Sequence, residues 1–144
     1  MYRAKIESLK DWKKKKDRKP LVFLGARQVG KTWLIQEFGR TFYRQMVYIN
    51  FEEADSPGDI FKSDFDIDRI VTLFNAYSGL KITVEDTLIV FDEIQSARRG
   101  ITALKYFYEK APWYHIIAAG SLLGINLHPN ESFPVGKVEF LTLF

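Results

Sequence analysis

Gly25-Ala26-Arg27-Gln28-Val29-Gly30-Lys31-Thr32 is the stretch that decides the fold of this chain. It matches the pattern G-x-x-x-x-G-K-[ST] of the phosphate-binding P-loop. The apolar residues 21–24 before it predict a buried strand, and residues 31–42 after it predict a helix. A P-loop requires this order of strand, loop and helix, so the surroundings of the motif agree with it.

The residue types of this loop suit a phosphate group. Glycine at both ends lets the backbone approach an anion without a Cβ clash, and the loop N–H groups and the helix N-terminus then face phosphate oxygens. We expect Lys31 to reach the β- and γ-phosphates of ATP and the Thr32 hydroxyl to bind Mg²⁺. Arg27 and Gln28 face either the nucleotide or a neighbouring subunit. The residues expected to hold the nucleotide are Gly25, Ala26, Arg27, Gln28, Val29, Gly30, Lys31, Thr32 and Trp33.

A second motif, Asp92-Glu93, directly follows the continuous apolar run 88–91 and has the pattern of a Walker B strand. The end of this strand would place Asp92 near the Mg²⁺ held by Thr32, and Glu93 can orient or deprotonate the attacking water. Phosphoryl transfer mainly needs positioning and charge neutralisation, which these groups supply. Ser121 ends the next strand, where it either contacts the γ-phosphate or the water as a sensor 1 residue, or serves as a turn or N-cap serine. The predicted catalytic residues are therefore Glu93, Lys31 and Ser121.

Strands and helices alternate along the chain, which predicts an α/β fold with a mostly parallel sheet and helices on both of its faces. Ligands of such sheets bind beyond the carboxyl ends of the strands. Ser96 is expected to cap the fourth helix. Residues 122–133 are expected to form a loop with a possible helical turn. Strands are expected at 21–25, 46–51, 88–91, 114–119 and 137–144, and helices at 1–12, 31–42, 66–78 and 99–111.

Composition limits the class of protein. The 144 residues suffice for one domain with its own core. The chain has no cysteine, which excludes disulfides and thiolate metal sites. No apolar run has the length of a membrane span, and the Lys-rich N-terminus lacks the apolar region of a signal peptide. We therefore expect a cytoplasmic protein without a membrane partner.

Charge is distributed unevenly. Residues 1–20 hold nine Lys or Arg and three Asp or Glu, a net charge of +6, whereas the remaining 12 basic and 15 acidic residues give −3. Residues 13–19 form a basic run that is either a solvated helix end and linker or a contact for polyphosphate or nucleic acid. Charge alone thus gives weak support for a nucleic-acid partner.

Several further residues have both a functional and a structural interpretation. Arg98 or Arg99 could serve as an arginine finger in trans, but exposed arginines at a helix start explain them more simply. His115 lies in a predicted buried strand and is expected to be a packed core residue, and His128 is an isolated loop residue. The tryptophans are expected to be core or interface anchors: Trp12, Trp33 and Trp113.

Five segments together resemble the prokaryotic AAA-type ATPases that carry a C-terminal DUF4143 domain: 25–32, 48–52, 91–95, 118–123 and 133–138. The resemblance implies a P-loop core of the ASCE class with strand order 5-1-4-3-2. It assigns the Walker A role to Gly25, Gly30, Lys31 and Thr32, the Walker B role to Asp92 and Glu93, and a sensor role to Ser121. An association with DNA, mobile elements or defence follows only by analogy.

Members of that family continue past the point at which this chain ends. We therefore expect a basic N-terminal helix and linker over 1–19 and an ATPase core over 20–144, without the lid and the C-terminal domain. A core without its lid exposes apolar surface, which favours a homo-oligomer.

Three functions are compatible with the sequence. The first is Mg²⁺-dependent ATP hydrolysis that drives a conformational change in the C-terminal domain, and the second is a nucleotide-binding module without turnover. The third is a small-molecule kinase, against which Glu93 counts, because P-loop kinases of small molecules usually lack a glutamate at this position.

Overall fold

The computed structural model describes residues 2–25, 30–121, 134 and 136–143. Every strand and helix expected from the sequence is present there, with ends shifted by at most two residues, while the expected loop 122–133 and His128 lie outside the described residues. None of the described helices is long and apolar enough to cross a membrane. The helices are α1 (Tyr2–Lys14), α2 (Lys31–Phe42), α3 (Ile67–Ser78), the 3₁₀ helix η1 (Ile94–Ser96) and α4 (Gly100–Lys110), and the strands are β1 (Leu21–Gly25), β2 (Gln45–Asn50), β3 (Thr87–Asp92), β4 (His115–Ser121) and β5 (Glu139–Leu143).

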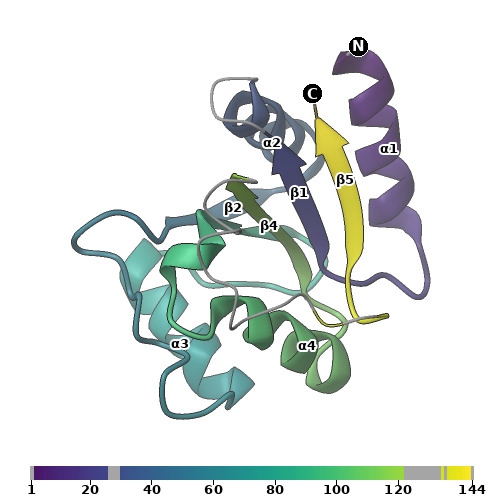
Figure 1. The fold of residues 1–144 in the computed structure, drawn as a ribbon. Coiled ribbons are helices and arrows are strands. Elements are labelled where there is room, and N and C mark those ends of the chain that lie inside the picture. The colour runs from purple at the N-terminus through teal and green to yellow at the C-terminus, as the bar shows by residue number, and fades with distance from the viewer. Residues whose placement is uncertain (1, 26–29, 122–133, 135, 144) are drawn as a thin grey trace.

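The five strands form one sheet in the order β2-β3-β4-β1-β5, and every pair of neighbours is parallel (Figure 1). Read from the β5 edge, this is the order 5-1-4-3-2, so the predicted fold class and strand order are confirmed. The strand before the P-loop, β1, lies inside the sheet between β4 and β5. It is therefore supported by hydrogen bonds on both sides.

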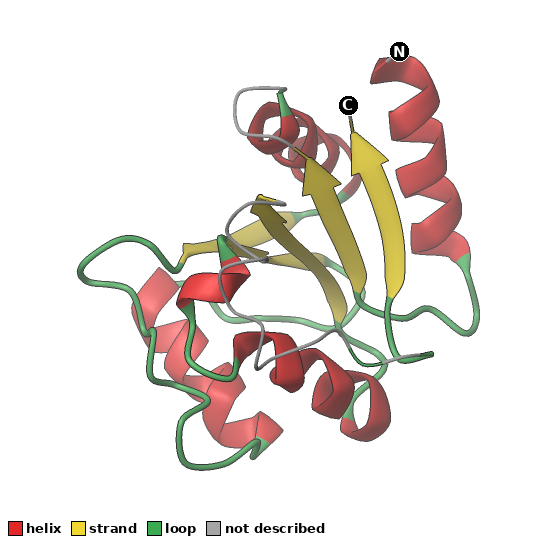
Figure 2. Cartoon of the chain, viewed as in Figure 1, coloured by secondary structure: helices red, strands yellow, loops and turns green. Residues whose placement is uncertain are grey.

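Helices cover both faces of the sheet and give three layers (Figures 1 and 2). Successive side chains of a strand point to opposite faces, so each strand supplies two cores. Phe23 of β1 packs in a cluster with α1 and α2, whereas Val22 packs in a second cluster with α3 and α4. Both clusters consist of buried apolar side chains, which agrees with the continuous apolar strands of the sequence.

The start of α4 differs from the expectation. Ser96 does not cap this helix, because it ends η1, and the N-cap position of α4 belongs to Arg99, which has a left-handed backbone (φ 62°) and makes no side-chain capping bond. Immediately after the Walker B strand, the chain forms the 3₁₀ turn and only then α4. Gly100, the first residue of α4, lies so close to η1 that a Cβ there would be 2.9 Å from the Ile94 carbonyl oxygen and 2.9 Å from Ala97 Cβ.

This close approach makes Gly100 a stability determinant. We expect Gly100→Ala to lower the free energy of unfolding by about 1–3 kcal/mol, because the added methyl group forces η1 and α4 apart. Chemical denaturation with a circular dichroism readout measures this change. Gly58→Ala is the matched control, since its added Cβ would be 3.9 Å from the nearest atom, Ser56 Oγ, and should change stability by less than about 0.5 kcal/mol. Equal stability of the two variants would contradict the expected clash.

Candidate nucleotide site

The candidate site lies where the carboxyl ends of the parallel strands meet. Gly25 at the end of β1 is paired with Ser121 of β4, and Asn50 at the end of β2 is paired with Asp92 of β3. The two motifs and Ser121 are thus brought to one end of the sheet, where the carboxyl ends of the strands lie; we call it the carboxyl edge. The side chain of Ser121 is not among the described parts of the chain, so its position relative to the site is an expectation.

The described part of the P-loop begins at Gly30, and the expected nucleotide residues Ala26, Arg27, Gln28 and Val29 lie outside the described residues. Gly30 has a left-handed backbone (φ 80°) that favours glycine, and its carbonyl accepts the first helical hydrogen bond of α2 from Leu34 N at 2.9 Å. Lys31 follows as the first residue of α2 and is only 6% exposed. Its Nζ has no hydrogen-bond partner within the described ranges. A buried ammonium group requires an anionic partner, and a phosphate would supply it.

Asp92, at the end of β3, is the centre of the second half of the candidate site. The residue is 5% exposed. Its Oδ1 accepts a hydrogen bond from the Glu93 backbone N–H at 2.9 Å, and its Oδ2 accepts one from the Tyr48 hydroxyl. Phe91 faces α3 and α4. Asp92 is the next residue of the strand, so its side chain points to the opposite face of the sheet, on which α2 begins.

Tyr48 connects the two motifs and was not singled out from the sequence. Its hydroxyl is hydrogen-bonded both to Asp92 and to the side chain of Thr32. Burial first, and then the hydrogen bond to Asp92, raise the pKa of the Tyr48 phenol, while the hydrogen bond with Thr32 opposes this shift. The available signal was strand parity: Tyr48 is two residues before Asn50, so its ring points to the face of the sheet that also carries Asp92.

Glu93 is held by a neighbour that sequence reasoning also missed. Its backbone is left-handed (φ 51°), which costs a residue with a side chain about 1 kcal/mol. Its Oε2 accepts a hydrogen bond from Gln95 Nε2 at 2.6 Å. Gln95 is buried, and its own Oε1 has no hydrogen-bond partner within the described part of the chain. Gln95 therefore determines the orientation of Glu93, and the only sequence signal was its place in the quoted segment 91–95.

The described residues fit a magnesium nucleotide better than a metal held by protein alone. Within the described ranges, no group of three or more His, Cys, Asp or Glu side chains is placed to hold a metal ion. A cation here would have Thr32, Asp92 and phosphate oxygens as ligands. Mg²⁺ commonly binds through one or two carboxylates and the phosphates of its substrate. The unpartnered Lys31 Nζ agrees with the same occupant.

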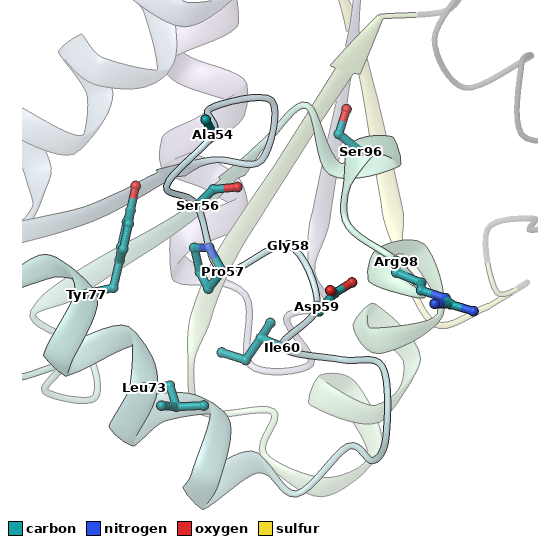
Figure 3. Close-up of a pocket in the computed structure, with 10 residues that line it drawn as sticks. All are labelled: Ala54, Ser56, Pro57, Gly58, Asp59, Ile60, Leu73, Tyr77, Ser96 and Arg98. Carbon is teal, nitrogen blue, oxygen red and sulfur yellow. The ribbon is translucent and has the colours of Figure 1, made fainter.

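The two candidate arginine fingers lie at the start of α4. Arg99 is exposed, but its guanidinium lies 4.3 Å from the centre of the Phe65 ring and donates to the Lys62 carbonyl at 3.2 Å. Arg98 is exposed and lines a cavity of about 600 Å³, in which Arg98 and Ser96 lie opposite Leu73 and Tyr77 of α3 (Figure 3). Both residues are therefore exposed arginines at the start of a helix, and Arg99 already contacts Phe65 and Lys62 of its own chain.

The tryptophans do not share one role. Trp12 is buried in the core beneath α1, as expected, and its Nε1 donates to the Lys19 carbonyl at 2.7 Å. Trp33 and Trp113 are 55% and 50% exposed, so neither is a core anchor, and their alternative role as interface anchors stays a prediction. Exposure follows from position, since Trp33 lies on the outer side of α2 and Trp113 lies in the turn before β4.

Contacts of the basic run favour a structural role. Lys13 lies 4.9 Å from the centre of the Tyr43 ring, Lys15 pairs with Glu139, and Arg18 donates to the Lys13 carbonyl at 3.0 Å. Basic residues are also favourable at the C-terminus of a helix such as α1. These contacts support the interpretation as a helix end and linker over a contact for polyphosphate.

Comparison with known proteins agrees with the geometry. A family model described as an AAA domain matches residues 17–144. The match includes both motifs and all five strands. A search of curated proteins finds no match.

His115 lies at the opposite end of the sheet from these motifs and is a packed residue, as expected. It is 5% exposed, its Nδ1 is 2.7 Å from the Tyr43 hydroxyl, and its ring meets the Trp12 ring edge-on at 6.1 Å. Burial first, and then the charges of Arg18 and Lys13, lower the pKa of His115 to about 3.

The lowered pKa of His115 predicts a pH dependence of stability. Between about pH 3 and 6.5, His115 is protonated in the unfolded chain but neutral in the folded chain. The free energy of unfolding therefore decreases as the pH falls through this window, by at most about 1.4 kcal/mol per pH unit. Denaturation of the natural chain and of His115→Gln at pH 7.5 and 5.5 should show a loss about 1 kcal/mol larger in the natural chain. Tyr43→Phe removes the hydrogen bond but keeps the burial, and it should retain the pH slope. An identical slope in His115→Gln would show that His115 is not its source.

Proposed function

The chain belongs to the AAA domain family, and we propose that it binds ATP with Mg²⁺ at the carboxyl edge of its sheet and hydrolyses the γ-phosphate. The observation that carries this proposal is the buried Lys31 Nζ, which has no partner among the described residues and lies at the start of the helix that follows the P-loop. An ammonium group in this situation is stabilised by an anion. The N-terminus of α2 adds the favourable end of a helix dipole.

Each binding residue has a distinct role in this proposal. Lys31 pairs with the β- and γ-phosphates, and Gly30 leaves space for them because it has no Cβ. The Thr32 hydroxyl and the Asp92 carboxylate hold the cation. When bound, Mg²⁺ would neutralise charge on the phosphate oxygens during transfer.

Glu93 is the proposed general base. Water attacks the γ-phosphorus, the bond from this phosphorus to the bridging oxygen of ADP breaks, and the proton of the water passes to the Glu93 carboxylate. Gln95 orients this carboxylate through the 2.6 Å hydrogen bond. Ser121, at the end of β4, is proposed to sense the γ-phosphate, and residues 25–33 to hold the nucleotide.

The finer parts of the proposal come from the sequence pattern and from the resemblance stated above. We propose residues 1–19 as a helix and linker, 20–144 as the ATPase core, and coupling of hydrolysis to a C-terminal DUF4143 domain. A cytoplasmic location and a homo-oligomer, in which Arg98 faces a neighbouring subunit, belong to the same proposal. Nucleic acid is the least supported partner, because the basic run is engaged within the chain.

One observation favours a second candidate, a nucleotide-binding module without turnover. Glu93 Oε2 already accepts a hydrogen bond from Gln95, so this acceptor is engaged within the chain and not by a water. Hydrolysis then needs Gln95 to release or rotate this carboxylate. Binding and turnover must therefore be measured separately.

Two substitutions separate binding from turnover. Lys31→Ala should weaken ATP binding at least tenfold, because it removes the cation that pairs with the phosphates. Glu93→Gln should keep the affinity within about threefold and slow phosphate release by about 10²–10⁴-fold, because the amide cannot accept the proton. Calorimetric titration measures the first effect, and a phosphate-release assay measures the second.

The exposed Glu109, near the end of α4 and at the amino ends of the strands, provides the matched control. Glu109→Gln makes the same chemical change away from the motifs and should leave both affinity and turnover unchanged. Turnover that survives Glu93→Gln would exclude Glu93 as the base. Tight binding with no phosphate release by the natural chain would favour the module, and absence of nucleotide binding would contradict both candidates.

A further inference from the structure

The Tyr48 hydroxyl lies between the two side chains that the proposed function assigns to the cation. It donates a hydrogen bond to Asp92 Oδ2 and is hydrogen-bonded to the Thr32 side chain. Tyr48 comes from β2, whereas Thr32 follows β1 and Asp92 ends β3. One phenol from a third strand thus joins the Walker A and Walker B halves of the site.

Asp92 depends on this phenol in the described conformation. Its carboxylate is nearly fully buried, and no ion pair within the described ranges includes it. The backbone N–H of Glu93 serves Oδ1, so the Tyr48 hydroxyl is the donor that serves Oδ2. A buried carboxylate oxygen without a donor is costly, which explains a phenol at this place.

The Tyr48 hydroxyl shares its partners with any cation bound here. Asp92 Oδ2 gives one lone pair to the Tyr48 hydroxyl, and a cation that takes Asp92 as a ligand, directly or through one of its waters, draws on the same carboxylate. The Thr32 side chain is shared in the same way, because it is hydrogen-bonded to Tyr48. Tyr48 and the cation therefore compete for Asp92, and the cation weakens the Tyr48–Asp92 hydrogen bond.

We infer that Tyr48 is a positioning residue that holds Thr32 and Asp92 together in the nucleotide-free chain and competes with Mg²⁺ for Asp92. This inference rests on the proposed binding of a magnesium nucleotide at this edge of the sheet. Removal of the hydroxyl destabilises only the nucleotide-free state. By linkage, its removal strengthens binding of the magnesium nucleotide.

The test compares ADP binding with excess Mg²⁺ and with EDTA, by calorimetry, in the natural chain, Tyr48→Phe and Tyr43→Phe. Tyr48→Phe should bind Mg²⁺-ADP at least about tenfold more tightly than the natural chain, since a hydrogen bond to a charged group is lost only from the free state. Binding of ADP in EDTA should be unchanged, so the ratio of the two affinities rises. Tyr43→Phe removes a more deeply buried phenol hydrogen bond at the other end of the sheet and should leave this ratio unchanged.

Thermal unfolding gives a second readout. Tyr48→Phe should unfold at a lower temperature than the natural chain without nucleotide, and the gap should close with saturating Mg²⁺-ADP, whereas the gap of Tyr43→Phe should persist. An affinity ratio that is unchanged or smaller in Tyr48→Phe would overturn the competition, because the hydroxyl would then be structural or would support the bound cation. Absence of ADP binding by the natural chain would instead overturn the proposed function itself, and the competition with it.

Discussion

Parallel pairing of β1 with β4 on one side and β5 on the other is the constraint on which the rest of the structure depends. It aligns Gly25 with Ser121, and the pairing of β2 with β3 aligns Asn50 with Asp92. Because all strands run in one direction, their polar ends collect at one edge. The period of two then decides which face each side chain reaches, and it sends Asp92 toward the start of α2.

Both ends of the parallel strands carry buried polar atoms, and they differ in which atoms have partners. At the opposite edge, His115, Tyr43 and Trp12 form a network in which the Tyr43 hydroxyl meets His115 Nδ1 and Trp12 Nε1 reaches a carbonyl. Within the described ranges, the buried atoms without a hydrogen-bond partner are Lys31 Nζ and Gln95 Oε1 at the carboxyl ends, and Arg18 Nε and Glu139 Oε2 at the amino ends. Proteins tolerate buried polar atoms without a protein partner mainly where a ligand or a water molecule forms the missing hydrogen bond. Arg18 and Glu139 make other hydrogen bonds, whereas Lys31 Nζ is the only polar atom of its side chain, so Lys31 has the greatest need of a ligand.

Local patterns predicted the fold well because they act over a few residues. The apolar run 88–91 and the glycine pattern of 25–32 need no knowledge of the rest of the chain. Side chains that meet across strands are different: the contact of Tyr48 with Asp92 depends on register, which only the folded sheet shows. Serine favours helix N-caps, which is why the sequence predicts a cap at Ser96. In the structure Ser96 is the last residue of η1, and the N-cap of α4 is Arg99. The exposure of Trp33 and Trp113 likewise depends on where their elements lie and not on hydropathy.

Two phenols, Tyr43 before β2 and Tyr48 within it, show that surroundings, and not residue type, determine a role. Tyr43 precedes the strand and hydrogen-bonds to a histidine that burial keeps neutral, while Tyr48 near the other end hydrogen-bonds to a carboxylate. A neutral partner inside a packed core has no competing ligand, so the first bond can only stabilise the fold. A buried carboxylate attracts cations, so the second bond stabilises the chain only as long as no cation replaces it. The hydrogen bond of Tyr43 before β2 is therefore static, and that of Tyr48 within β2 is exchangeable and lies where both motifs meet.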